Sequence, residues 1–504
     1  MSISKREIMA ENSRWMCASQ AMVEGVLKLP DSMEEISGVL DIAGVGEITD
    51  ASAGENSIFI EGNAVFCVLY VNKKGEFESF NATCRFNHTI ECDGVRPDMK
   101  VAAGAKLGEI SFSVLDGSSV SVRADICIDA FALCNQNFEI LDPELADGNI
   151  HLKCGQGEAS FVECVKMIKS YVKSELRVPQ SMPEVRKVLA ERGYAAVRGV
   201  VTEPGKAIIE GELRVFVVYE STDKNAPLQY FQETIPFGEI VNHENIGADS
   251  AVTVHASLER LAVDTAPENP DLLEISAVVN LCVMSRGMRQ LSYIEDLYDE
   301  KSEMDTQSCE IGACNASMRE GQKKIVRLEA QIPENAPEVS RVLFTAAVPK
   351  TVCIHPQRDR ATIDGKLAVN ICYTTADAGI KSAAMVLPFE TEISLPGVTP
   401  NCELQVYANV EYAMAEGSGR ELSLKCCLDL CIWQMQNERM RAVCEASSQP
   451  LEQPCQSGAV IYYADGGETL WDIAKRFKVS SDMLGNGEPD AVIPKGQRLI
   501  FIRK

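Results

Sequence analysis

The sequence is short of positive charge. Its 504 residues contain 48 Lys and Arg against 73 Asp and Glu, a formal net charge of -25. Nucleic acids and anionic membrane surfaces favour proteins with a surplus of basic side chains, so neither is expected as a partner. The hydrophobic fraction of 46% and the charged fraction of 24% are ordinary for globular proteins. The chain can therefore bury cores, and its length predicts about three or four domains.

Long apolar runs are missing as well. No stretch approaches the roughly 20 apolar residues of a transmembrane helix, and the first twenty residues lack the apolar segment of a secretory signal. We therefore expect the protein in the cytoplasm of the cell that makes it. The 19 cysteines are scattered without a CxxC motif, which agrees with a reducing compartment. We interpret the tightest group, Cys426, Cys427 and Cys431, as buried apolar side chains, with a metal or redox role as the alternative.

Motifs of the common enzyme classes are also absent. The sequence has no GxxxxGK[ST], HExxH or GxSxG, and its five histidines show no HxH or HxxxH spacing. We therefore predict no catalytic residue, no metal site and no cofactor.

What the sequence does contain is one pattern in three copies. The copies open with LPDSMEEISGVL from Leu29, VPQSMPEVRKVL from Val178 and IPENAPEVSRVL from Ile332. In each copy a proline, a glycine and a tyrosine follow at the same spacing, at Pro30, Gly62 and Tyr70, at Pro179, Gly211 and Tyr219, and at Pro333, Gly365 and Tyr373. The copies are too long for solenoid units, so each is predicted to be a domain.

The segment between glycine and tyrosine alternates as a strand with one buried face does. Its apolar positions are Ala64, Phe66, Val68 and Tyr70, then Leu213, Val215, Val217 and Tyr219, then Leu367, Val369, Ile371 and Tyr373. We expect each tyrosine to anchor a core while its hydroxyl finds a polar partner. A second aromatic marker, again in strand-like sequence, occurs at Phe86, Phe237 and Phe389. Regular strands without helical patterns between them predict antiparallel sandwiches.

The predicted fold class is mainly β, with three tandem β-sandwich-like domains followed by a small β-α-α-β domain. Polar stretches without the repeat pattern are taken as linkers. The predicted organisation is an N-terminal segment 1–22, repeats 23–145, 166–298 and 325–444, linkers 146–165, 299–324 and 445–458, and a C-terminal unit 459–504.

The C-terminal unit differs from the repeats. Its first strand is predicted from Val460 to Tyr463, and Thr469 with Asp472 fits a capping box at a helix start. Apolar residues from Leu470 to Phe477 then recur at helical spacing. A second short helix and a closing strand complete the order β-α-α-β. The unit holds 7 basic and 6 acidic residues, so it is almost neutral and its recognition should depend on shape and apolar contact.

The sequence YYADGGETLWDIAKRFKVSSDML followed by IPKGQRLIF resembles the LysM module. The resemblance implies a shallow groove for N-acetylglucosamine-containing glycans, between the strand-to-helix loop and the loop before the last strand. In this sequence the groove residues would be Gly467, Glu468, Thr469, Leu470, Trp471, Val492, Ile493, Pro494 and Gly496. Trp471 is either a core residue or a contact residue.

Three such β-rich repeats before one LysM-like unit are similar to the SPOCS-domain proteins of spore-forming clostridia. The resemblance implies a non-enzymatic spore-coat morphogenetic protein of the mother-cell cytoplasm, located at the forespore surface. It also implies that the LysM-like unit binds a coat ATPase, SpoIVA, and that the repeats self-associate or contact other coat proteins.

Two alternatives stay open. One is a protein that binds peptidoglycan through the same groove. The other is an enzyme whose active site would appear as a departure of one repeat from the other two. The first repeat departs most, with Cys84 and His88 in CRFNH.

Overall fold

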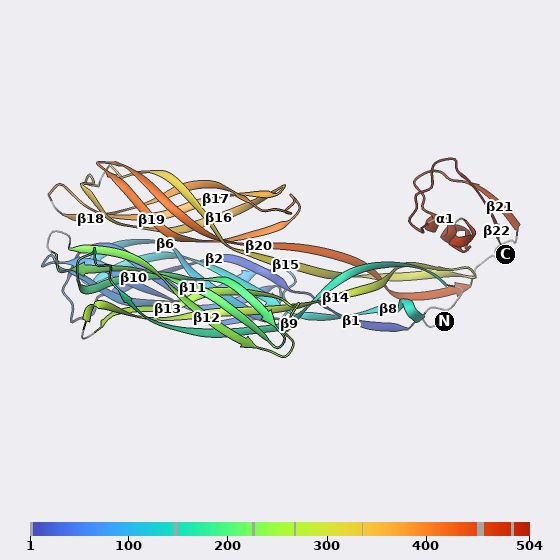
Figure 1. Cartoon of the computed structure of the whole chain (residues 1–504), viewed down its shortest axis with the longest axis horizontal. Helices are drawn as coiled ribbons and strands as arrows, with labels where there is room; N and C mark the ends of the chain where they lie inside the picture. Colours follow the sequence, from blue (N-terminus) through green and yellow to red (C-terminus); the bar gives the residue numbers. More distant parts are fainter. Residues whose placement is uncertain are drawn as a thin grey trace.

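The computed structural model describes residues 4–145, 150–223, 227–266, 269–334, 336–377, 379–450, 458–484 and 488–503. Before the C-terminal unit, these residues form almost only antiparallel strands (Figure 1). The sequence-based prediction of a mainly β fold with sandwich-like repeats is confirmed.

Each repeat consists of two three-stranded sheets that enclose one core. In repeat 1 the sheets have the strand orders β3-β4-β5 and β2-β7-β6. Apolar side chains from both sheets meet between them, as the alternating sequence predicts. The strands are β2 (Arg14–Lys28), β3 (Ile36–Gly54), β4 (Ser57–Asn72), β5 (Phe77–Glu91), β6 (Lys100–Asp116) and β7 (Ser119–Leu133).

Repeats 2 and 3 have the same arrangement of two three-stranded sheets. In repeat 2 the strands are β9 (Ile150–Arg177), β10 (Val185–Glu203), β11 (Lys206–Ser221), β12 (Leu228–Asn242), β13 (Ala251–Ala266) and β14 (Asn269–Asp299). In repeat 3 they are β15 (Ser302–Gln331), β16 (Arg341–Gln357), β17 (Arg360–Thr374), β18 (Ile380–Ser394), β19 (Glu403–Ser418) and β20 (Glu421–Pro450).

The glycine and phenylalanine markers of the three copies are cross-strand partners. Gly211 pairs with Phe237, and the other pairs are Gly62 with Phe86 and Gly365 with Phe389. A Cβ atom on Gly211 would lie 2.2 Å from the Phe237 ring. The glycine therefore leaves room for an aromatic ring to cover the backbone.

The three marker tyrosines are fully buried, as predicted. Each hydroxyl donates a hydrogen bond to a backbone carbonyl in the opening segment of its own repeat. The bonds run from Tyr219 to Pro183 and from Tyr373 to Pro337 at 2.9 Å, and from Tyr70 to Glu34 at 3.2 Å. One contact thus recurs at equivalent positions of all three copies.

Cysteines follow two patterns. Cys426 and Cys427 are buried in strand β20, which confirms their interpretation as buried apolar side chains, and Cys431 is partly buried. Cys17 on β2 and Cys92 after β5 form a disulfide.

Three two-stranded ribbons extend beyond the sandwiches and pack together (Figure 1). One ribbon pairs β1 (Lys5–Glu11) with β8 (Asn135–Leu141), and the others continue the pairs β9-β14 and β15-β20. Ile140, Leu291 and Met440 contribute one apolar side chain from each ribbon to a shared core. We call this bundle the stalk, made of β1, β8 and residues 150–162, 286–299, 302–312 and 439–450.

The segments predicted as linkers differ from irregular connections. The described residues of 146–165, 299–324 and 445–458 lie mostly in long strands that reach into the stalk. A ribbon in a thin bundle buries only one narrow face, so most of its side chains stay polar and the strand pattern is weak in the sequence.

The three sandwiches pack around a common axis through equivalent positions. Leu69, Val218 and Cys372, which each precede a marker tyrosine, lie in one buried cluster. Phe131, Met284 and Trp433 belong to a second cluster shared by the three repeats. The repeats therefore form one body with approximate threefold symmetry.

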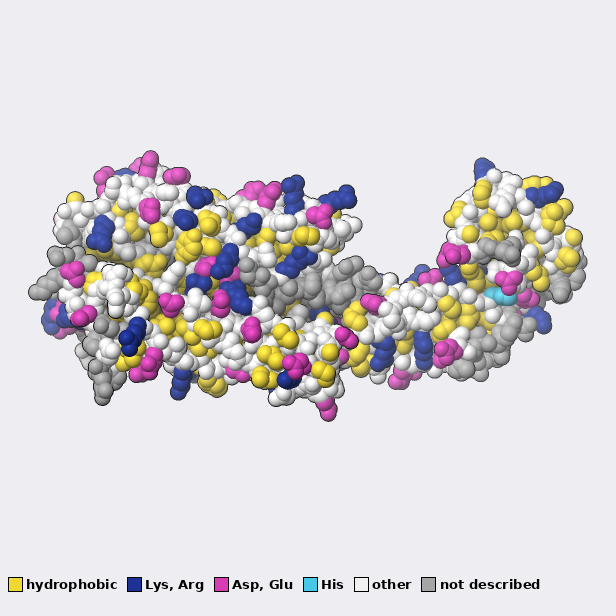
Figure 2. Space-filling view, viewed as in Figure 1, with side chains coloured by type: hydrophobic (Ala, Val, Ile, Leu, Met, Phe, Trp, Pro, Cys, Tyr) yellow, Lys and Arg dark blue, Asp and Glu magenta, His cyan; other side chains and the backbone are white. Residues whose placement is uncertain are grey.

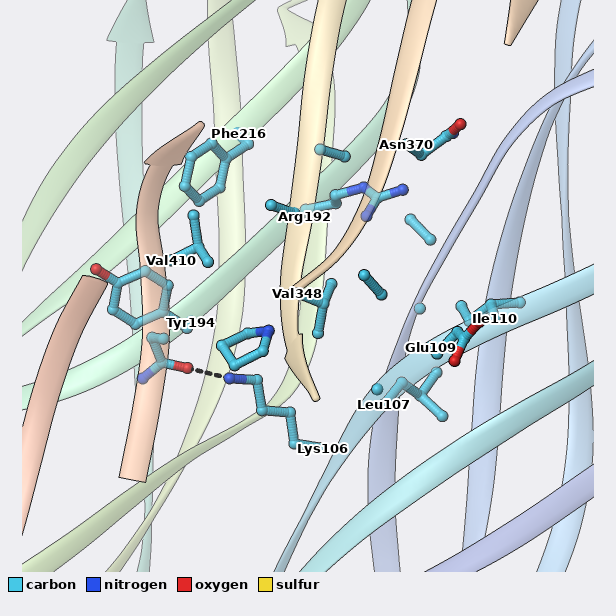
Figure 3. A pocket seen from close by; sticks show the side chains of 18 of the residues that line it. Lys106, Leu107, Glu109, Ile110, Arg192, Tyr194, Phe216, Val348, Asn370 and Val410 are labelled. Atoms are coloured by element: carbon cyan, nitrogen blue, oxygen red, sulfur yellow. Dashed lines mark hydrogen bonds between the residues drawn. The ribbon is translucent and has the colours of Figure 1, made fainter. Parts of the chain in front are cut away.

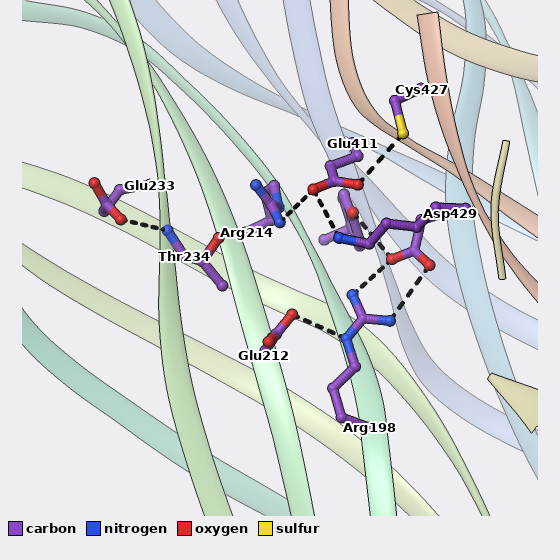
Figure 4. Close-up of polar contacts among 10 residues, drawn as sticks. Arg198, Glu212, Arg214, Glu233, Thr234, Glu411, Cys427 and Asp429 are labelled. Carbon is purple, nitrogen blue, oxygen red and sulfur yellow. Dashed lines mark hydrogen bonds and ion pairs between the residues drawn. The ribbon is translucent and has the colours of Figure 1, made fainter. Parts of the chain in front are cut away.

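Polar contacts supplement this packing. Arg198 of repeat 2 reaches Asp429 of repeat 3 at 2.7 Å, and Arg214 reaches Glu411 at 2.8 Å (Figure 4). Burial alone would raise the pKa of Glu411, but the hydrogen bond from Lys323 and the charge of Arg214 lower it. These acidic groups are ion-paired parts of an interface between repeats.

Candidate functional site

The candidate site lies in the C-terminal unit. It consists of β21 (Gly458–Tyr463), α1 (Leu470–Phe477), the 3-10 helix η2 (Ser481–Met483) and β22 (Arg498–Arg503), and β21 pairs antiparallel with β22. The second helix of the predicted β-α-α-β order is therefore only one 3-10 turn.

The predicted capping box at the start of α1 is present. The Thr469 hydroxyl accepts a hydrogen bond from the Asp472 amide at 3.1 Å, and the Asp472 carboxylate accepts one from the Thr469 amide at 2.9 Å. The hydrogen bonds that the amide and the hydroxyl of Thr469 donate to the Asp472 carboxylate lower the pKa of Asp472. The helix start and the strand-to-helix loop are thereby held in one conformation.

The two predicted walls of the groove lie side by side. The Ile493 amide donates to the Glu468 carbonyl at 2.8 Å, and the Leu470 amide donates to the Ala491 carbonyl at 3.2 Å. Thr469 and Val492 form an isolated β-bridge between these two bonds. The backbones of the two loops are therefore joined, and only their outward side chains and turns offer a surface.

The nine predicted groove residues separate into three groups. Leu470, Trp471 and Ile493 are buried. Thr469 caps the helix, and the Glu468 carboxylate accepts a hydrogen bond from Tyr462 at 2.7 Å and pairs with Arg476 at 2.6 Å. The residues that remain exposed are Gly467, Val492, Pro494 and Gly496.

Trp471 connects the C-terminal unit with the stalk. Its indole Nε1 donates a hydrogen bond to Asp296 of β14 at 2.8 Å, and its ring meets Tyr298 edge to face at 5.0 Å. Lys475, one turn further along α1, reaches the same Asp296 carboxylate at 2.7 Å. Trp471 is therefore a core residue of the unit that also contacts the stalk.

Further contacts surround this junction. Tyr298 donates its hydroxyl hydrogen to the Val479 carbonyl at 2.7 Å and stacks on His151 of β9 at 4.8 Å between ring centroids. Burial, with the nearby charges of Glu300 and Asp482, raises the pKa of this tyrosine. Side chains of the stalk thus cover one face of α1.

Sequence reasoning missed the stalk residues of this junction. Asp296 and Tyr298 belong to YIEDLYDE, an acidic segment without a motif. The available signal was Trp471 itself, a large aromatic side chain in the first turn of a short amphipathic helix.

On the other side of the unit, apolar side chains lie in solvent (Figure 2). Ile461 is 60% exposed and Ile502 is 65% exposed, and Tyr463 and Ile500 are exposed on the same outer face of the β21-β22 ribbon. A cluster of large apolar side chains on one small face is typical of interaction surfaces.

The fold defines a class of protein in which three β-sandwiches pack together and their strands continue into one shared stalk. Residues 35–115, 184–266 and 338–416 each match the family model described as SipL, SPOCS domain. The chain therefore contains three SPOCS domains, and the family that this model describes is non-enzymatic and related to sporulation. No curated protein and no solved structure matches the chain.

Each match covers the same part of its repeat. The matched regions correspond to β3 through β6, β10 through β13, and β16 through β19. The remaining two strands of each sandwich lie outside the matches, and in repeats 2 and 3 both of them continue into the stalk. In the part of the chain that the structure describes, no helix is long and apolar enough to span a membrane.

Proposed function

We propose that the protein is a non-enzymatic assembly protein of the spore coat, made in the mother cell and located at the forespore surface. The observation that carries this proposal is the presence of three SPOCS domains in one chain. The separate C-terminal unit with LysM-like sequence supports it, because a recruiting element needs a surface distinct from the repeats.

The proposed partner of the C-terminal unit is a SpoIVA-like coat ATPase. Two features of the unit favour a protein as ligand. Its exposed surface includes a cluster of large apolar side chains on β21 and β22, and apolar cores are typical of protein interfaces. Its net charge is close to zero, so the contact would depend on shape rather than on long-range attraction.

Glycan binding is the second candidate function. The adjacency of the two groove walls favours it, because the strand-to-helix loop and the loop before β22 are joined as a LysM groove requires. Val492 is 63% exposed and stands at this junction, so it would contact either ligand.

A binding assay separates the two candidates. Full-length protein should retain the coat ATPase in a pull-down and stay in the supernatant when mixed with purified peptidoglycan. The substitution Val492→Asp should reduce ATPase retention about tenfold or more, because it places a charge in an apolar contact. The matched control is Val201→Asp on β10, another exposed valine in a strand, which should bind as the wild type does.

The opposite result, sedimentation with peptidoglycan and no ATPase retention, would overturn the assembly proposal. Trp471 and Ile493 are unsuitable probes of the groove because both are buried. A fluorescent fusion supplies an independent readout, since a ring around the forespore supports assembly and labelling of the vegetative wall supports glycan binding.

A further inference from the structure

A cavity of about 520 Å³ lies between the three repeats. Its walls come from β3 and β6 of repeat 1, β10 and β13 of repeat 2, and β16 and β19 of repeat 3, with smaller contributions from neighbouring strands. Ligand sites in proteins typically have volumes of about 300–1,000 Å³. The cavity therefore has the size of a small-molecule site, and it is independent of the C-terminal unit.

Small residues at equivalent positions line this space. Gly44, Gly193 and Ala347 occupy the same position in the three copies and all line the cavity. The larger lining side chains are mostly apolar, and Figure 3 shows Phe216 and Val410 among them. These apolar side chains could pack against the apolar part of a ligand.

The charged groups of the wall are paired with one exception. Arg192 pairs with Asp41, and Lys350 beside the cavity pairs with Glu109. Lys106 instead donates hydrogen bonds to two neutral oxygens, the Ala408 carbonyl at 2.8 Å and the Asn409 side chain (Figure 3). Among the described residues, no carboxylate lies within ion-pair distance of its ammonium group.

The ammonium group of Lys106 also lies 5.3 Å from the centroid of the Tyr407 ring. Burial lowers the pKa of Lys106 to about 8, although the charges of Cys127, Asp129 and Asp429 oppose the shift. Neither Asp129 nor Asp429 forms an ion pair with Lys106, so an anion placed beside its ammonium group would gain a charge-assisted hydrogen bond. The single unpaired cation, Lys106, and the apolar side chains around it are complementary to a molecule with one anionic group and a hydrocarbon chain.

We propose that this cavity binds an amphiphilic monocarboxylate, with its carboxylate at Lys106 and its hydrocarbon chain among the apolar side chains that the three repeats contribute. A bound molecule would bridge the three repeats, because Lys106 belongs to repeat 1 and the other lining residues come from all three repeats.

Calorimetric titration of the full-length protein with octanoate, decanoate and dodecanoate, each below its micelle concentration, tests the proposal. One molecule should bind per chain, and affinity should rise about fourfold for each added methylene group until the cavity is full. Lys106→Met should lower octanoate affinity about tenfold and leave 1-octanol binding unchanged. Lys100→Met, an exposed lysine of the same strand, is the matched control and should have no effect.

A second variant tests the cavity without altering charge. Ala346→Leu places a larger side chain in the wall and should weaken octanoate and 1-octanol alike, while circular dichroism stays that of the wild type. The proposal is wrong if no fatty acid binds, if binding does not saturate near one per chain, or if Lys106→Met binds octanoate as tightly as the wild type.

Discussion

Trp471 illustrates how one side chain can serve two parts of a molecule. Its ring belongs to the core of the C-terminal unit, together with Leu470 and Ile473. Its indole nitrogen donates a hydrogen bond to Asp296 of the stalk, and its ring packs against the ring of Tyr298 in the same strand. Loss of Trp471 would therefore disturb both the folding of the unit and its position, which makes the residue a poor reporter of either alone.

The marker glycines are required for a different reason. Gly211→Ala would place a Cβ atom 2.2 Å from the Phe237 ring, so the ring or the strand must move. We expect a loss of about 1–3 kcal/mol in the free energy of unfolding, measured by urea denaturation of the full-length protein. Gly238→Ala on the partner strand is the control, because its Cβ would meet its nearest neighbour at 3.5 Å. Equal destabilisation by the two substitutions would contradict this role of the glycine.

Prediction from sequence also worked best at single repeated residues. The buried strand faces, the tyrosine anchors and the capping box at Thr469 were predicted correctly because each depends on local periodicity or on one short motif. The cross-strand pairing of Gly62 with Phe86 was not predicted. Both markers were visible in the sequence, but the register of a hairpin depends on the geometry of its turn, which the sequence reasoning did not assign.

At the scale of elements, the stalk was the main feature that sequence reasoning missed. Its strands are rich in polar residues, because each ribbon buries only the face that meets its two neighbours. The C-terminal unit was predicted more closely, apart from η2. The two loops predicted to form its groove lie side by side, and their role in binding stays a prediction. The sequence could not reveal that the stalk covers the neighbouring helix face, since Asp296 is distant in the chain.

The junction between α1 and the stalk should depend on Asp296. Asp296→Ala removes the acceptor of both Trp471 and Lys475 and leaves a partly buried indole nitrogen without a partner. We expect faster hydrogen exchange in residues 470–477 and in the facing stalk residues 291–299, by about tenfold or more for bonds protected by docking.

The control for this experiment is Glu310→Ala, also in the stalk, whose carboxylate pairs with the exposed Arg439. Its exchange pattern should match that of the wild type. Unchanged exchange in Asp296→Ala would mean that the C-terminal unit is held by contacts other than this carboxylate.

At the scale of the whole molecule, buried ion pairs hold the repeats together. Arg198→Met leaves the carboxylate of Asp429, which is 4% exposed, without its guanidinium partner. Breaking a buried pair in this way costs about 3–5 kcal/mol, and we expect a corresponding fall in the urea midpoint.

The control is Arg186→Met in the same repeat, which breaks a more exposed pair with Glu220 and should lower the free energy of unfolding by less than about 1 kcal/mol. If the two variants unfold at the same midpoint, the pair at Asp429 does not hold repeats 2 and 3 together.

The core shared by the three repeats should also make the molecule sensitive to acid. His255 is buried against Phe131 and Tyr407, and this burial lowers its pKa from 6.5 to about 4. Between these values the unfolded chain binds a proton that the folded chain does not, so stability falls as the pH decreases from about 6.5 towards 4. A difference of this size corresponds to a loss of about 3 kcal/mol. The melting temperature of His255→Gln should therefore decrease less between pH 7 and pH 4.5 than that of the wild type. The control is His355→Gln at an exposed position, whose melting temperature should decrease as much as that of the wild type. An unchanged acid response in His255→Gln would show that protonation of this core does not limit stability.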